Sequence, residues 1–345
     1  MTTEGVLQRI QELRGRLGSA VAVLGHHYVA DEVIQFADHR GDSLELSRVA
    51  ASASDAAHIV FCGVDFMAES AALLCAPGQL VHLPAADARC PMAGMADTVD
   101  VAREWNELAH LWEGDVVPVT YQNSSGELKA FCGERGGAVC TSSNAGAVFR
   151  WALERRGHIV FFPDEHLGRN TALSLGLRAE EISVWDPRRP SGEQVGLEGA
   201  RVVVWSGDCH VHTLFTVRQV ERAREKYPQA RVIVHPECPA EVVGTADSAG
   251  STSYMVRVVA EAPAGSSFVI GTETHLVNRL AAEHADKTVV PLARSFCDAM
   301  GRITPGRLLA VLESIERGGE GYVVRVPSHV TRGARLALDR MLETV

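Results

Sequence analysis

The sequence predicts an α/β protein made of three similar units, each a three-layer α/β/α sandwich with a short parallel sheet. Short apolar strands alternate with amphipathic helices, the same order of elements recurs three times, and each recurrence ends in a strand that runs into a cysteine. Ligands bind beyond the carboxyl ends of parallel strands, so we expect a pseudo-threefold arrangement in which three sets of strand ends face one central cavity.

Each unit begins with an apolar strand that ends in polar residues, and a cluster of small and hydroxyl residues then opens a helix. A further strand and helix follow, and the closing strand leads to the cysteine. The first strands and their polar ends lie at 21–38, 116–131 and 231–247. The helix openings lie at 41–51, 140–153 and 250–261. The later strand–helix pairs lie at 59–74, 159–174 and 268–283, and the closing strands at 79–90, 200–209 and 287–297.

The spacing between corresponding residues divides the chain into three domains. We assign 1–98 with the C-terminal helices of 306–345 to the first domain, 99–209 to the second and 210–305 to the third. The middle copy is longer because of a charged, proline-containing stretch near 175–199, which we interpret as a surface insertion.

Charge and composition exclude several classes of protein. Lys and Arg total 33 against 43 Asp and Glu, a net charge of −10, which disfavours binding to nucleic acid or to an anionic membrane. The sequence has no apolar run long enough to cross a membrane and no signal-peptide pattern, so we expect a cytoplasmic protein with reduced cysteines. Lysine is scarce: only Lys129, Lys226 and Lys287 occur.

Cys90, Cys209 and Cys297 hold the same place in the three repeats, after the closing strand and before a helix. Three thiols brought to one axis predict a three-ligand metal site, and thiolates select zinc, Cu(I) or iron–sulfur centres. Only three ligands leave one position open for a Lewis-acid role. The alternative for each cysteine is a small buried apolar residue, and we assign that role to the rest: Cys62, Cys75, Cys132, Cys140 and Cys238.

Polar residues at the strand ends form the second candidate set. The first strands end at His26, Tyr28, Tyr121, Asn123, His235 and Glu237, and the second strands lead to Ser43, Ser142 and Thr252. Hydroxyls beside helix starts suit carboxylate or phosphate groups, although a helix N-cap is their commoner role. His235 and Glu237 are two apart on an extended segment and should point the same way. His27, His210 and His212 are ambiguous. The His210-x-His212 pair resembles a metal-binding pair, but it directly follows Cys209, so we expect it to orient that cysteine or to cap the helix. Asp164 and Glu273 are weaker candidates.

Several long motifs resemble the quinolinate synthase family. They are GHHYVADEVIQFADHRGDSLELS, FCGVDFMAESA, CPMAGMAD, VTYQNSSGELKA, CTSSNA, PDEHLGRN, WSGDCHVH, HPECPAEVV, AGSTSYM and IGTETHLVNRL. The resemblance implies three α/β domains and a [4Fe–4S] cluster on Cys90, Cys209 and Cys297. It also implies condensation of iminoaspartate with dihydroxyacetone phosphate, releasing phosphate and water, to give quinolinic acid for NAD biosynthesis.

The resemblance also implies roles for the polar residues. Tyr28, Tyr121, His235 and Glu237 are expected to move protons, and His26, Ser43, Asn123, Ser142 and Thr252 to bind substrate. An L-aspartate oxidase or an aspartate dehydrogenase is the expected source of iminoaspartate. No C-x-x-C pair lies near Cys297, so we expect no thiol–disulfide regulation there.

Two alternatives stay open from the residues alone. One is a cluster-free aldolase with Lys129 as the Schiff-base amine. Lys129 follows Asn123 by about a turn and a half of helix, which predicts that it points away from the strand ends. The other is a non-catalytic iron–sulfur sensor, but the sequence offers no basic segment to bind nucleic acid.

Overall fold

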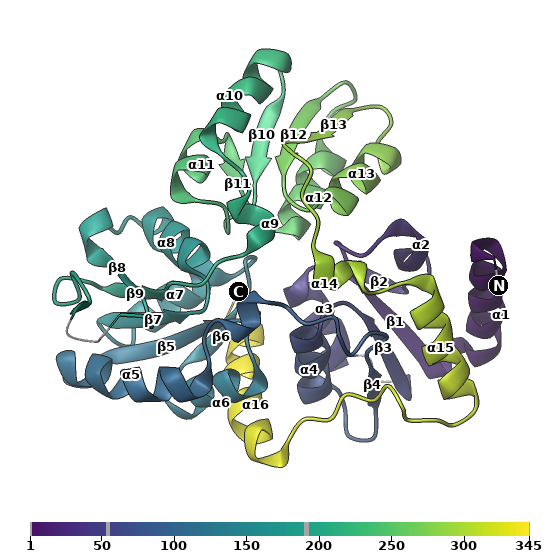
Figure 1. The fold of residues 1–345 in the computed structure, drawn as a ribbon, viewed down its shortest axis with the longest axis horizontal. Coiled ribbons are helices and arrows are strands. Elements are labelled where there is room, and N and C mark those ends of the chain that lie inside the picture. The colour runs from purple at the N-terminus through teal and green to yellow at the C-terminus, as the bar shows by residue number, and fades with distance from the viewer. Residues whose placement is uncertain (1, 53–55, 190–192, 345) are drawn as a thin grey trace.

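A computed structural model describes residues 2–52, 56–189 and 193–344. It contains three separate sheets, and every pair of named strands within them runs parallel. Figure 1 shows the three sheets, with their helices, arranged around a common centre. The predicted fold class is therefore confirmed.

The first sheet has the strand order β2-β1-β3-β4. Its strands are β1 (Val21–His26), β2 (His39–Gly41), β3 (His58–Cys62) and β4 (Leu80–His82). The accompanying helices are α1 (Thr3–Leu17), α2 (Asp31–Ile34), α3 (Ser43–Ser52) and α4 (Asp65–Leu74).

The second sheet has five strands in the order β6-β5-β7-β9-β8. Its strands are β5 (Val116–Tyr121), β6 (Ala138–Cys140), β7 (His158–Phe162), β8 (Ile182–Trp185) and β9 (Val202–Trp205). Its helices are α5 (Thr98–Leu111), α6 (Gly126–Glu134), α7 (Ala145–Leu153) and α8 (Glu165–Ser174).

The insertion near 175–199 is more than a surface loop. Its β8 pairs with β9 and adds an edge strand to the sheet, and Trp185 at the end of β8 is fully buried. The expectation of a surface insertion was wrong for this strand, because burial of Ile182 and Trp185 ties it to the core. Residues 190–192 of the insertion lie outside the described part.

The third sheet has the order β11-β10-β12-β13. Its strands are β10 (Arg231–Val234), β11 (Ser248–Ala249), β12 (Ser267–Gly271) and β13 (Thr288–Pro291). Its helices are α9 (His210–Thr213), α10 (Val217–Lys226), α11 (Ala240–Thr245), α12 (Thr252–Glu261) and α13 (Thr274–Glu283).

The central strands explain why each unit folds around its own sheet. Residues of β5, β7, β10 and β12 form nearly continuous apolar runs that are buried on both faces. Such runs are typical of parallel sheets covered by helices on both sides. Each crossover helix presents one apolar face, as in α12, where Met255 and Val259 are fully buried four residues apart.

The C-terminal helices connect two of the units. After α14 (Asp298–Gly301), α15 (Pro305–Glu316) packs on α1, whereas α16 (Ser328–Glu343) packs on α6 and β6 of the second unit. Glycines permit that crossing: a Cβ at Gly133 of α6 would lie 1.9 Å from the carbonyl oxygen of Gly333 in α16. Among the described helices, none is both long and apolar enough to cross a membrane.

Candidate active site at the junction of three sheets

One cavity with an empty volume of about 660 Å³ lies where the carboxyl ends of the three sheets meet. All twelve residues that the sequence analysis assigned to metal binding, substrate binding or proton transfer line it, four from each unit or its closing segment. They are His26, Tyr28, Ser43, Cys90, Tyr121, Asn123, Ser142, Cys209, His235, Glu237, Thr252 and Cys297. The pseudo-threefold pattern therefore brings together residues that are up to 271 positions apart in the chain (297 − 26).

The three repeated cysteines occupy equivalent places at the cavity wall. Cys209 and Cys297 are the residues before α9 and α14, and Cys90 precedes a short 3₁₀ turn, Met92–Gly94. All three are free thiols at intermediate exposure. Burial raises the pKa of Cys90 to about 12, with Cys297 adding to the rise, and burial raises the pKa of Cys209 well above its usual value, with Glu237 and then Cys90 adding.

Backbone N–H groups are directed at two of these sulfurs. Those of Met92 and Ala93 lower the pKa of Cys90, against the larger effect of burial. Those of Ala299 and Met300 act in the same direction on Cys297, and burial still raises the pKa of this thiol to about 11. N–H donors stabilise a thiolate over a thiol. The surroundings of the two sulfurs therefore suit the ligand form of cysteine.

The other five cysteines stay out of the cavity lining. Four of them, Cys62, Cys132, Cys140 and Cys238, are fully buried in apolar cores. The fifth, Cys75, is partly exposed at the end of α4.

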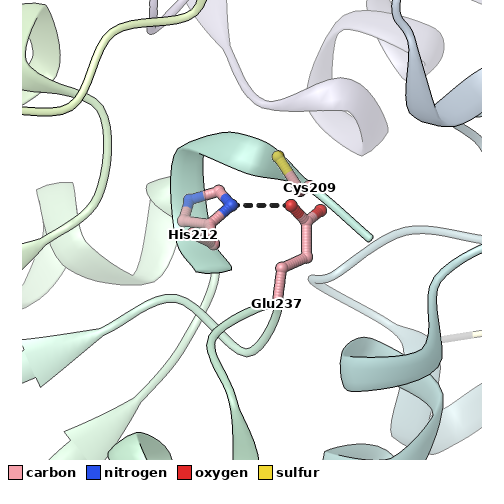
Figure 2. Close-up of side chains that lie close together, drawn as sticks. All are labelled: Cys209, His212 and Glu237. Carbon is pink, nitrogen blue, oxygen red and sulfur yellow. Dashed lines mark hydrogen bonds and ion pairs between the residues drawn. The ribbon is translucent and has the colours of Figure 1, made fainter. Parts of the chain in front are cut away.

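An acid–base pair lies beside Cys209 (Figure 2). His212 Nδ1 is 2.7 Å from Glu237 Oε2, and both side chains are buried. The ligand atoms of Cys209, His212 and Glu237 all lie within 4.8 Å of one another. His212 also lines the cavity, so the expectation that it merely orients Cys209 or caps a helix misses its main contact. The spacing Cys209-x-x-His212 carried the signal, because residues three apart share one face of a helical turn.

The His212–Glu237 pair extends to a tyrosine from the first unit. Tyr28 Oη is 2.7 Å from Thr272 Oγ1 and 3.3 Å from His212 Nε2. Thr272 Oγ1 also lies 3.2 Å from His212 Nε2. Sequence reasoning did not single out Thr272, which directly follows β12 and precedes the weaker candidate Glu273. Glu273 does not line the cavity and instead caps α13.

Burial keeps His26 and His235 neutral. It lowers the pKa of His235 to about 3, assisted by His212, on which its ring is stacked at a centroid distance of 4.2 Å. Burial likewise lowers the pKa of His26 well below its usual value. His26 Nδ1 accepts the Tyr28 N–H at 3.2 Å and His235 Nδ1 accepts the Glu237 N–H at 3.3 Å. Each neutral ring therefore carries its proton on Nε2.

Two buried carboxyl groups near the cavity have opposite ionisation. Burial acts to raise the pKa of Glu237, but His235, His212 and the Tyr121 hydroxyl outweigh it and leave the pKa lowered. Burial and the neighbouring Glu237 raise the pKa of Asp164 well above its usual value. Asp164 does not line the cavity and caps α8 through a 2.6 Å bond from the Leu167 N–H. Of these two groups, Glu237 is thus the ionised one that lines the cavity.

The three candidate hydroxyls are not helix caps. Asp42 accepts the Leu44 and Glu45 N–H groups at the start of α3, and Ser251 accepts the Tyr254 N–H at the start of α12. Asn144 is the residue before α7. Ser43, Ser142 and Thr252 therefore hold cavity positions next to these residues, with no side-chain hydrogen bond to another described residue. The N-cap alternative is wrong for all three.

Asn123 and Lys129 differ in their relation to the cavity. Asn123 lines it, and its Oδ1 is buried without a hydrogen-bond partner among the described residues. Lys129 is fully buried within α6, and its Nζ donates to the Ser124 carbonyl oxygen at 2.5 Å. Lys129 is not part of the cavity lining, so its amine is poorly placed to form a Schiff base there.

Fold and cavity together define an α/β enzyme of three units with a shared, thiol-lined site. Comparison with known proteins gives the family: the family described as "Quinolinate synthetase A protein" matches residues 8–343. The quinolinate synthase of one strain of Bacillus cereus is 48% identical over 348 residues, covering 100% of this chain and 95% of the relative. Those of Bacillus cereus (strain Q1) and Bacillus anthracis (strain CDC 684 / NRRL 3495) are 47% identical with the same coverage. The chain belongs to the quinolinate synthase family, enzymes of NAD biosynthesis.

Proposed function

We propose that the chain condenses iminoaspartate with dihydroxyacetone phosphate to form quinolinic acid in the cytoplasm, with release of phosphate and water. One observation carries this proposal: anion-binding hydroxyls, acid–base groups and three free thiols line the same cavity. Substrates with carboxylate and phosphate groups need such hydroxyls, and loss of phosphate and water needs proton transfer in a confined site.

The cysteines fit a [4Fe–4S] cluster. Cys90, Cys209 and Cys297 come from three units, form no disulfide, and line one cavity, and backbone N–H groups directed at Cys90 and Cys297 suit thiolate ligands. When bound, a cluster with only three protein thiolates supplies a Lewis acid that polarises a substrate oxygen. Because the free thiols hold their protons at neutral pH, binding of the cluster must release protons.

We assign substrate binding to Ser43, Ser142, Thr252, Asn123 and His26. The three hydroxyls are free of the caps beside them, and Asn123 Oδ1 lacks a partner in the described structure. His26 has its Nε2 proton available because Nδ1 already accepts the Tyr28 N–H. These groups offer neutral hydrogen bonds to substrate oxygens, without a charged side chain that would hold the product too tightly.

We assign proton transfer to Tyr28, Tyr121, His235 and Glu237, with His212 as a connecting group. Glu237 is the base, since its carboxyl group stays ionised and lies 2.7 Å from His212 Nδ1. His212 donates through Nδ1 to Glu237, so its Nε2 accepts from the hydroxyl of Tyr28 or Thr272. Burial raises the pKa of both Tyr28 and Tyr121, so each phenol keeps a proton to donate to a leaving oxygen.

The test is an anaerobic preparation loaded with iron and sulfide and assayed for quinolinate by mass spectrometry. Glu237→Gln should lower kcat by about 10²–10⁴-fold and leave iron content unchanged, because it removes a base and not a cluster ligand. Glu241→Gln, on the exposed side of α11, is the matched control and should keep full activity. Failure of the loaded wild-type chain to form quinolinate would refute the proposal.

The source of iminoaspartate follows from the proposed reaction. An enzyme that oxidises aspartate at its amine must supply the imine, and an L-aspartate oxidase or an aspartate dehydrogenase would serve. The two alternative functions gain no support. The Schiff-base aldolase is disfavoured because Lys129 is held outside the cavity lining. The iron–sulfur sensor is disfavoured because the family comprises enzymes.

A further inference from the structure

A second hollow adjoins the central cavity on its outer side. Its empty volume is about 1140 Å³, and Asp42 and Ser142 line both spaces. The starts of α3, α7 and α12 surround it, one helix from each unit. It is therefore a candidate route between solvent and the site.

Three arginines occupy equivalent places in this hollow. Arg48, Arg150 and Arg257 are each the sixth residue of their helix, α3, α7 and α12 respectively. All three are exposed, and none forms an ion pair with an acid in the described part of the chain. The two acids in the lining, Asp42 and Glu45, are engaged in hydrogen bonds from backbone N–H and serine hydroxyl groups. Three arginines against these two acids give the lining of the hollow a formal charge of 3 − 2 = +1, and the arginines form no ion pair in the described structure.

Hydrogen bonds between the three units lie at the inner end of the hollow. The Ser143 hydroxyl donates to Asp42 Oδ2, and Ser143 Oγ lies 2.7 Å from Ser251 Oγ. Each of the three residues belongs to a different unit and adjoins one of the candidate substrate hydroxyls at Ser43, Ser142 or Thr252. The contact includes Asp42 and adjoins Ser142, the two residues that line both the hollow and the cavity.

We propose that the hollow is a vestibule that captures the phosphate group of the incoming substrate on Arg48, Arg150 and Arg257. This inference rests on the proposed function, because that function supplies a phosphate-bearing substrate. The chain has a net charge of −10, which repels such a molecule at long range. A local cluster of unpaired cations at the opening reverses that field and raises the association rate. The Asp42–Ser143–Ser251 contact then opens for passage.

The binding step is tested without activity, by modifying arginines with phenylglyoxal and measuring each site by mass spectrometry. Inorganic phosphate, compared with potassium chloride at equal ionic strength, should reduce modification of Arg48, Arg150 and Arg257 at least about threefold. Three exposed arginines without ion pairs in the described structure serve as controls and should be unaffected. These are Arg218, Arg222 and Arg332. Equal protection of all six arginines, or protection of none, would overturn the proposal.

The capture step is tested by kinetics of the cluster-loaded chain. A triple Arg→Gln variant at 48, 150 and 257 should lower kcat/KM for the phosphate substrate by about tenfold at low ionic strength, with kcat unchanged. The difference should shrink as salt is added, because salt screens exposed charges. A triple Arg→Lys variant should behave as wild type, since steering needs only charge. An unchanged kcat/KM, or a fall confined to kcat, would overturn the proposal.

The two arms separate this inference from the proposed function. If the loaded wild type forms no quinolinate, the proposed function fails, while the arginine protection still shows whether the hollow binds phosphate. If quinolinate forms but the triple Arg→Gln variant keeps its kcat/KM at low salt, only the vestibule fails.

Discussion

Replacing Lys129 by methionine should make the protein more stable and leave it active. Lys129 is fully buried in α6, and burial lowers the pKa of its amine from 10.5 to about 8, against the attraction of Glu69 and Asp65. A pKa lowered this far corresponds to about 3 kcal/mol of unfavourable free energy for the charged amine. Lys129→Met also removes the 2.5 Å hydrogen bond to the Ser124 carbonyl oxygen, and this loss destabilises the folded state by about 1–1.5 kcal/mol. The expected net gain for Lys129→Met is therefore about 2 kcal/mol at pH 7.

The pH dependence of that gain gives a second readout. Above pH 8 the folded chain begins to release the Lys129 proton, whereas the unfolded chain keeps it up to pH 10.5. The unfolded state binds more protons in this window, so wild-type stability rises from this residue as pH increases from 8 to 10.5. The advantage of Lys129→Met should therefore be full below pH 8 and should decline above it.

Urea denaturation of the cluster-free chain, kept reduced, measures the change at pH 7 and pH 10. Lys226→Met, at an exposed position at the end of α10, is the matched control and should change the free energy of unfolding by less than about 0.5 kcal/mol. Quinolinate formation by the loaded variant tests the chemistry. A destabilised Lys129→Met, or a folded, iron-loaded variant without activity, would refute the reasoning and restore the amine-based alternative.

Three further predictions concern the cavity. Cys209→Ser should reduce iron from about four per chain to below one by colorimetric assay, whereas Cys75→Ser should keep it; iron retained by Cys209→Ser would exclude that ligand. Ser142→Ala should raise KM about tenfold with an unchanged cluster absorbance spectrum, and bleaching with unchanged KM would contradict its role in substrate binding. The pKa of His235 is lowered to about 3, so the folded state lacks a proton that the unfolded state binds below pH 6.5. The free energy of unfolding should therefore fall as the pH is lowered from 6.5 to 3, and urea titrations should show a smaller fall for His235→Asn. An equal fall in the wild type and the variant would mean that the His235 ring is charged in the folded state.

Most of the fold was predictable because the signals are local and repeated. Apolar strands such as 231–234 and helix openings such as 250–261 recur at similar spacing in each unit, and recurrence reinforces signals that are weak alone. The strand β8 was missed because it has no counterpart in the other units and lies in a charged stretch. Its burial depends on contacts of Ile182 and Trp185 with the rest of the second unit, which composition alone does not reveal.

The candidate site was predictable in its members but not in its connections. Placement at strand ends sufficed to gather all twelve residues at one cavity. The partner of His212 was not predictable, because His212 lies in α9 whereas Glu237 lies in the turn after β10, and the contact depends on side-chain orientation. The same holds for Thr272, which meets a tyrosine 244 positions away. Helix caps were misjudged by one residue, since Asp42 and Ser251 each precede the hydroxyl expected to cap.

The threefold repetition itself separates two kinds of position in the site. Where all three units carry the same chemistry, as in the thiols and the helix arginines, the three side chains can act together on one group at the axis. The strand ends place two residues, two apart, at the same point of each unit, but there the chemistry differs: His26 and Tyr28, Tyr121 and Asn123, His235 and Glu237. Only one of these three pairs includes a carboxylate.

An asymmetric reaction on a symmetric scaffold requires this division. A symmetric set of ligands holds a group without distinguishing its sides, whereas a base must lie on one side of the substrate and the proton donors on another. Glu237 and His212 both belong to the third unit, and Tyr28 and Tyr121 approach them from the first and second. Exchanging the chemistry of equivalent strand ends should therefore abolish activity although the fold and the thiols remain. A double variant, Asn123→Glu with Glu237→Asn, tests this, and quinolinate formation at the wild-type rate by that variant would show that the side of the base is unimportant.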